Sequence, residues 1–314
     1  MAAAMMGSLL NGLKIDDQEA REATGLWSRV VLVFLCLVAA FAYRGSVSLV
    51  PSGVAKDAFL ASLAALFLAV ALLLRRSERL RRYWQIAFAF FVFTVAGFAG
   101  DVNISPLQRA FVAGVLHQSA TADNPLASTV LGTVLVQLFS TLCIVVPIVV
   151  LIKASGSDAG SLFIRKPSSW AVVAIGFLGL VVFYYLAERG RTEAFFPHSS
   201  VSPARFLALT PALLALVLMN GLREELWFRG LFLRRFGEFL GPWPSNLLTA
   251  VIFTSFHVQV QYALHLLPFL AFTLLLGLVF GYLMQRSGSI LGSALLHAGS
   301  DIPIFLAYLS YAAN

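Results

Sequence analysis

Charged residues are scarce in this chain of 314 residues. Asp, Glu, Lys and Arg together make up 12% of it, whereas they approach roughly a quarter of a soluble domain. Hydrophobic residues make up 59%, and the mean hydropathy is +0.86. The stretch from Phe239 to Gln285 holds no Asp, Glu, Lys or Arg at all. These values exclude an ordinary soluble domain and indicate an integral membrane protein.

Cysteine is equally scarce, and a nucleic-acid-binding surface is not expected. Cys36 and Cys143 fall in separate apolar stretches, where they are interpreted as packing residues and not as a disulfide. The net charge of +7 comes with no soluble basic domain that would bind nucleic acid. Residues 1–26 contain acids and no long apolar core, so they predict a cytoplasmic lead-in and not a cleavable signal peptide.

Long apolar runs predict an all-α polytopic protein with eight or nine transmembrane helices. About 17 or more apolar residues are needed to cross a hydrocarbon core. The predicted spans are 27–46, 58–74, 83–100, 126–152, 168–187, 206–235, 246–260, 261–285 and 289–311. The prediction of the first span is weak because arginines flank its apolar part closely. The seventh and eighth spans share one uncharged stretch, so the sequence does not fix the boundary between them.

The positions of Lys and Arg predict the orientation in the bilayer. Arginines crowd the loop between the second and third spans, at positions 75, 76, 79, 81 and 82. Lys153, Arg165 and Lys166 lie between the fourth and fifth spans, and the alternate loops carry balanced charge. By the positive-inside rule, the N-terminus and the arginine-rich loop are cytoplasmic.

Ionisable residues divide the chain into two parts. The spans within 27–187 carry charges only near their ends, so this part is interpreted as a transmembrane scaffold. The part from 206 to 311 carries acids, histidines and arginines within its apolar helices. Ionisable groups at membrane depth cost free energy and usually mark function. The catalytic core is therefore expected in the last four helices.

Three short patterns carry this chemistry, and they are Glu224-Glu225-x-x-x-Arg229, Phe253-x-x-x-His257 and His297-x-x-x-Asp301. Residues four apart share a helix face, so Glu225 can pair with Arg229 and His297 with Asp301. Glu224 is rotated by about 100° from Glu225 and shows no partner in its own helix. One carboxylate is therefore expected to be neutralised and structural, and the other free to act.

Depth in the membrane suggests that these groups meet. Glu224, His257 and His297 each lie about three helical turns from the predicted cytoplasmic boundary. A carboxylate and two imidazoles that converge in a cavity are suited to activating water for hydrolysis of an amide bond. The same three residues could also be the ligands of a zinc ion that carries a hydrolytic water. The residues alone do not decide between activation of water by Glu and His and activation by zinc.

In this order and on separate transmembrane helices, the three patterns resemble the CAAX protease and bacteriocin-processing (CPBP, or Abi) family. Its best-known members are type II CAAX prenyl endopeptidases. The resemblance covers roughly 206–308 and is strongest in the segment that begins at Arg223. It implies an intramembrane endopeptidase whose active site opens toward the cytoplasm. By position, Glu224 and His257 would activate water, while His297 and Asp301 would hold the oxyanion.

The resemblance further implies that Glu225 and Arg229 brace the site. Prenyl endopeptidases carry Asn at the position of Asp301, and an ionised Asp would repel an oxyanion, so orienting or charging His297 is the expected role here. The family's mechanism is glutamate-type or zinc-dependent. The substrate would be a membrane protein or peptide. A non-catalytic scaffold, an immunity or assembly factor of the same fold and a proton-coupled transporter are the alternatives.

Overall fold

The structure is a computed structural model that describes residues 25–51, 53–101, 104–119, 124–193, 196–197, 199–258, 260 and 265–312, with the backbone only at 47 and 48. Within these ranges the regular structure is helical and contains no strand, which confirms the all-α prediction. Most of the expected lead-in, residues 1–24, lies outside the described residues.

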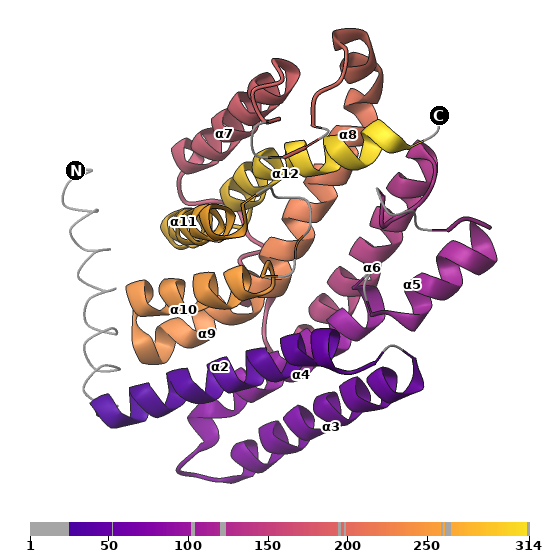
Figure 1. Cartoon of the computed structure of the whole chain (residues 1–314). Coiled ribbons are helices and arrows are strands. Elements are labelled where there is room, and N and C mark those ends of the chain that lie inside the picture. Colours follow the sequence, from indigo (N-terminus) through magenta and orange to yellow (C-terminus); the bar gives the residue numbers. More distant parts are fainter. Residues whose placement is uncertain are drawn as a thin grey trace, which may run out of the picture.

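The described residues of the first half form five long helices and three short helical segments. The long ones are α2 (Leu26–Leu49), α3 (Val54–Arg76), α4 (Trp84–Gly100), α6 (Val130–Ala154) and α7 (Trp170–Glu188), and the short ones are η1 (Arg81–Tyr83), α5 (Pro106–Ala110) with the π turn η2 (Phe111–Val115), and η3 (Ala159–Leu162). The helices α2, α3 and α4 pack side by side, and α4 also packs against α6 (Figure 1).

The second half holds the helices that carry the three patterns. They are α8 (Pro203–Glu224), the π-helical segment η4 (Glu225–Gly230), α9 (Leu231–Leu240), α10 (Pro242–Ser255), α11 (Leu266–Ser287) and α12 (Leu291–Tyr311). The helix α12 packs most extensively against α7 and α8, and it crosses α8 in Figure 1.

Seven stretches of the described residues are long and apolar enough to cross a membrane. They include α11, the long helices of the first half, and one 38-residue stretch, Pro203–Leu240, that joins α8, η4 and α9. The other two predicted spans correspond to α10, which has 14 residues, and to α12, which has 21 residues but carries His297 and Asp301. The fold is that of a polytopic, all-helical membrane protein.

The boundaries around α10 differ from the expected span of 246–260. The preceding helix continues to Leu240, and Gly241, at φ 82°, lets the chain turn before Pro242 opens α10. The helix α10 ends at Ser255, so His257 lies in the turn that follows it and not inside a helix. The prediction that His257 lies on a continuous span is therefore wrong.

Two buried apolar clusters hold the helices together. One surrounds α4, η4 and α9 with aromatic side chains such as Phe93, Trp227 and Phe232, and the other joins α8 to α12. The helix α2 instead exposes large apolar residues along much of its length, as expected of a surface in contact with lipid. Cys36 and Cys143 are both free, which agrees with their interpretation as packing residues.

Candidate active site

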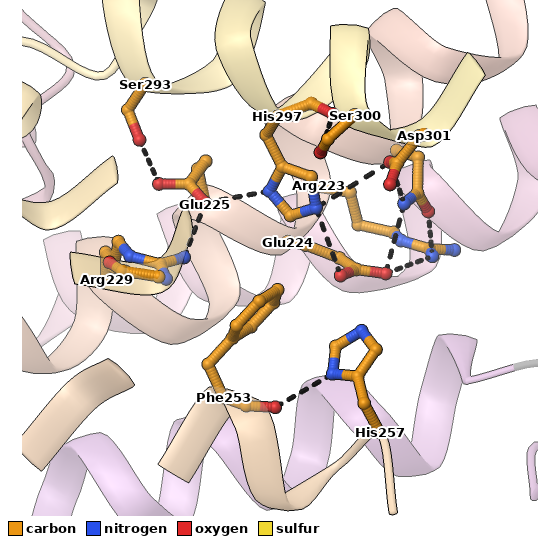
Figure 2. Close-up of polar contacts among 12 residues, drawn as sticks. Arg223, Glu224, Glu225, Arg229, Phe253, His257, Ser293, His297, Ser300 and Asp301 are labelled. Atoms are coloured by element: carbon orange, nitrogen blue, oxygen red, sulfur yellow. Dashed lines mark hydrogen bonds and ion pairs between the residues drawn. The ribbon is translucent and has the colours of Figure 1, made fainter. Parts of the chain in front are cut away.

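The adjacent acids Glu224 and Glu225 lie where α8 passes into the π-helical segment η4. A π turn accommodates one extra residue and is frequent at functional sites. The two carboxylates face different partners, as the rotation between neighbouring helical positions predicts (Figure 2).

Glu225 is completely buried and holds three polar side chains. Its Oε1 accepts from Nη1 of Arg229 at 2.5 Å and lies 2.8 Å from Nδ1 of His297. Its Oε2 accepts from the hydroxyl of Ser293. The predicted pair of Glu225 and Arg229 is therefore present, and it extends to α12 through Ser293 and His297.

Arg229 is a fully buried cation placed between aromatic rings. Its guanidinium carbon lies 4.6 Å from the ring centroid of Phe253 and 5.1 Å from that of Phe280. Nη2 donates to the carbonyl oxygen of Gly277 at 3.1 Å. The ring faces and the Glu225 carboxylate together offset the cost of removing this charge from water. Phe253 of the second pattern thus contacts the buried cation.

His297 is oriented on both sides of its ring. Because Nδ1 lies against the Glu225 carboxylate, it donates there, and this leaves Nε2 on the other side. Nε2 lies 3.6 Å from Oε2 of Glu224 and 3.6 Å from Oδ2 of Asp301. The ring of Phe280 stacks on the imidazole with a centroid distance of 4.8 Å. The predicted i,i+4 pair of His297 and Asp301 is present.

Glu224 does have partners in its own helix, so the expectation of an unpaired carboxylate is wrong. Its Oε1 accepts from Nη2 of Arg223 at 3.2 Å and from Nδ2 of Asn220 at 3.2 Å. Adjacent helical residues do not normally face each other, but the long arginine side chain reaches back. Glu224 still differs from Glu225, because 18% of its side chain is exposed while that of Glu225 is buried.

His257 lies across Glu224 from His297. Its Nδ1 is 2.9 Å from the carbonyl oxygen of Phe253 in the last turn of α10, and this oxygen also accepts from the backbone nitrogen of Phe256. Nδ1 therefore donates to this carbonyl, and Nε2 is left as an acceptor. Figure 2 shows the His257 ring turned toward the Glu224 carboxylate, which interacts electrostatically with both imidazoles.

The sequence patterns missed several side chains that complete this site. Asn220 and Ser293 contact the site acids, and Phe280 stacks on His297. The two polar residues stand four positions before Glu224 and His297, so the spacing of helical neighbours could have found them. No sequence signal distinguishes Phe280 from the many other phenylalanines.

Carboxylate oxygens and imidazole nitrogens, the donor atoms of Glu224, His257 and His297, both bind zinc. A zinc-bound histidine typically donates its other ring nitrogen to a carboxylate, as His297 does to Glu225. In the part of the chain that the structure describes, however, no group of three or more His, Cys, Asp or Glu side chains is arranged to hold a metal ion. Binding of zinc by these three residues therefore stays a prediction from the sequence.

Comparison with known proteins gives one match. Residues 206–302 match the family model described as type II CAAX prenyl endopeptidase Rce1-like. No curated protein and no solved structure matches the chain. The matched residues include all three patterns and every side chain of the site described above. Two further contacts come from outside the match, because Gln137 donates to Asn220 and Ser140 accepts from Arg223. Residues 206–302 are thus similar to a CAAX-type intramembrane protease domain.

Proposed function

We propose that this protein is an intramembrane endopeptidase that cleaves a peptide bond of a membrane-associated protein or peptide with water activated by Glu224 and His257. The observation that carries the proposal is the position of the partly exposed Glu224 carboxylate between two imidazoles, in a domain of a CAAX-type protease family. Following the description of that family, the proposed substrate is a prenylated protein with a C-terminal CAAX sequence.

In the proposed reaction, a water molecule lies between Glu224 and Nε2 of His257. Glu224 accepts a proton from the water, and the oxygen attacks the carbonyl carbon of the scissile bond. The C–N bond of the tetrahedral intermediate then breaks. The proton held by Glu224 passes to the departing nitrogen, so that a carboxylic acid and an amine are formed. His257 orients the water through its free nitrogen.

His297 is the proposed donor to the oxyanion of the intermediate. Three carboxylates of the site (Glu224, Glu225 and Asp301) face two guanidinium groups, those of Arg223 and Arg229, and a protonated His297 balances these charges. Its Nε2–H then points to the side of the ring where the reaction occurs. Nδ1 stays bound to Glu225, so the imidazole keeps its orientation during turnover.

The test is cleavage of an internally quenched, farnesylated CAAX peptide by the purified protein in detergent. We expect Glu224→Gln and His257→Ala each to lower kcat/KM by about 100-fold or more, which is the usual size of a general-base contribution. Glu188→Gln and His265→Ala are matched controls outside the site, and both should cleave at the wild-type rate.

Unchanged cleavage in both site variants would end the assignment of Glu224 and His257. Absence of cleavage by the wild-type protein, for the farnesylated peptide and for its unprenylated counterpart, would favour a non-catalytic scaffold of the same fold.

Metal removal separates the two chemical routes. The proposed reaction activates water through Glu224 and His257 without a metal ion, so we expect a chelator to leave the cleavage rate unchanged. Loss of activity on chelation that zinc restores would contradict this expectation. It would assign Glu224, His257 and His297 as zinc ligands that generate the nucleophilic water.

A further inference from the structure

The side-chain amide of Asn220 connects the two acids that flank His297. Its Nδ2 donates to Oδ2 of Asp301 at 2.7 Å and to Oε1 of Glu224 at 3.2 Å. Glu224 belongs to α8 and Asp301 to α12, so one amide group bridges two helices. Both carboxylates in turn lie 3.6 Å from Nε2 of His297.

The other end of the same amide is held by two donors. Its Oδ1 accepts from Nε2 of Gln137 at 3.1 Å and from Nη2 of Arg223. A carbonyl oxygen accepts and an NH₂ group donates, so these donors leave only one orientation for the amide. In the reversed orientation Oδ1 would face two carboxylates, and the NH₂ group would face two donors.

We propose that Asn220 is a positioning residue that fixes the spacing of Glu224 and Asp301 around His297, and that Gln137 of α6 acts through Asn220 by setting the direction of its amide. The proposal rests on the function proposed above. Without the bridge, the buried carboxylate of Asp301 and the partly exposed carboxylate of Glu224 would repel each other and rotate apart. Glu224 would then lose its place between His257 and His297.

A second residue of α6 reaches the site through Arg223. The hydroxyl of Ser140 accepts from Nη1 of Arg223 at 2.7 Å and donates to the carbonyl oxygen of Gly100, at the end of α4. Arg223 donates to both Glu224 and Asn220. The helix α6, which the sequence places in the scaffold, thus supplies two side chains that hold Asn220 and Arg223, the partners of Glu224. The helix α4 holds Ser140 through the carbonyl of Gly100.

The variants Asn220→Leu and Gln137→Met keep approximate size and remove the amide. We expect Asn220→Leu to lower kcat about 10- to 100-fold, the factor for losing hydrogen bonds to charged groups, with KM changed far less. Gln137→Met removes one neutral donor, so a fall of about 3- to 10-fold is expected. Melting temperatures in detergent establish that the variants fold.

Gln108→Met is the matched control. Gln108 is another buried glutamine, and its Nε2 donates to the carbonyl oxygen of Val136 on the same helix α6 at 3.1 Å, but it does not contact the site acids. We expect its kcat to equal that of the wild type. An equal loss in Gln108→Met and Gln137→Met would assign both to the general stability of α6 and overturn the positioning role.

The double variant tests whether Gln137 acts through Asn220. If it does, Gln137→Met has no further effect on kcat in the Asn220→Leu background. If kcat of the double variant instead falls by the product of the two single-variant factors, that part of the proposal is overturned. Wild-type kcat in Asn220→Leu would overturn the whole.

One measurement does not depend on cleavage and separates this inference from the proposed function. The infrared band of the Asp301 carboxylate is identified as the one that disappears in Asp301→Asn. This band should shift in Asn220→Leu and in Gln137→Met but not in Gln108→Met. An unshifted band overturns the inference even if the protein cleaves nothing.

Discussion

The charges of the site converge on a single imidazole. His297 lies against Glu225 through Nδ1, and its Nε2 is equidistant from Glu224 and Asp301. Burying so many ionised groups costs several kcal/mol of desolvation, and the cost is offset only while every charge keeps its partner. Removing one partner therefore leaves an uncompensated charge, and conservative substitutions give the clearest test of individual roles.

Asp301→Asn is such a substitution. The side-chain oxygen of Asn can still accept from Nδ2 of Asn220, and the amide can orient His297 or donate to an oxyanion. We expect kcat within about tenfold of the wild type, because one charged hydrogen-bond acceptor is exchanged for a neutral one. Complete loss of cleavage in a folded variant would show that the negative charge of Asp301 is essential.

At the scale of helices, the site depends on the close crossing of α8 and α12. Gly221 lies one turn before the acids on α8, and a β-carbon there would be 2.5 Å from the carbonyl oxygen of Ala294 and 2.9 Å from the nitrogen of Ala298. These are backbone atoms of α12 that cannot rotate away. Glycine at this position lets α12 bring His297 and Asp301 up to Glu224.

Gly221→Ala should therefore separate the two helices. We expect destabilisation of about 1–3 kcal/mol, the usual cost of overpacking, with a lower melting temperature and reduced cleavage. Gly237→Ala on α9 is the matched control, because the β-carbon it adds would meet only the Ser245 hydroxyl at 3.7 Å. If Gly221→Ala matched Gly237→Ala in melting temperature and rate, the close crossing would not limit the site.

At the scale of the whole molecule, segments predicted to lie on the cytoplasmic side meet in the fold. The backbone nitrogen of Ser168 donates to Ser287, and Nε of Arg165 donates to the carbonyl oxygen of Gly288 at 2.7 Å. The loop after α6 and the loop between α11 and α12 therefore lie together. A shared face is what alternating membrane crossings require, although orientation relative to the cytoplasm stays a prediction from the distribution of Lys and Arg.

Labelling of single cysteines tests that orientation. In a Cys36→Ala, Cys143→Ala background, we expect Arg79→Cys to react with a membrane-impermeant maleimide only when the cytoplasmic face is accessible. Arg191→Cys, in the exposed loop after α7, should react from the opposite face. Labelling of both positions from the same side would contradict the predicted topology.

Local patterns predicted much of this protein. Pairing of Glu225 with Arg229 and of His297 with Asp301 follows from helical periodicity, since residues four apart are neighbours in any helix. Apolar run length likewise predicted most helices, and the three ordered patterns indicated the family that the comparison confirms.

Contacts between helices could not be predicted in this way. The approach of His297 to Glu224, the place of His257 beyond the end of α10 and the reach of Gln137 from α6 to Asn220 depend on how helices cross and where they end. Periodicity within one helix carries no information about the rotation or depth of its neighbour. The amino-acid order thus specifies which chemical groups enter the membrane, and helix packing specifies which of them meet.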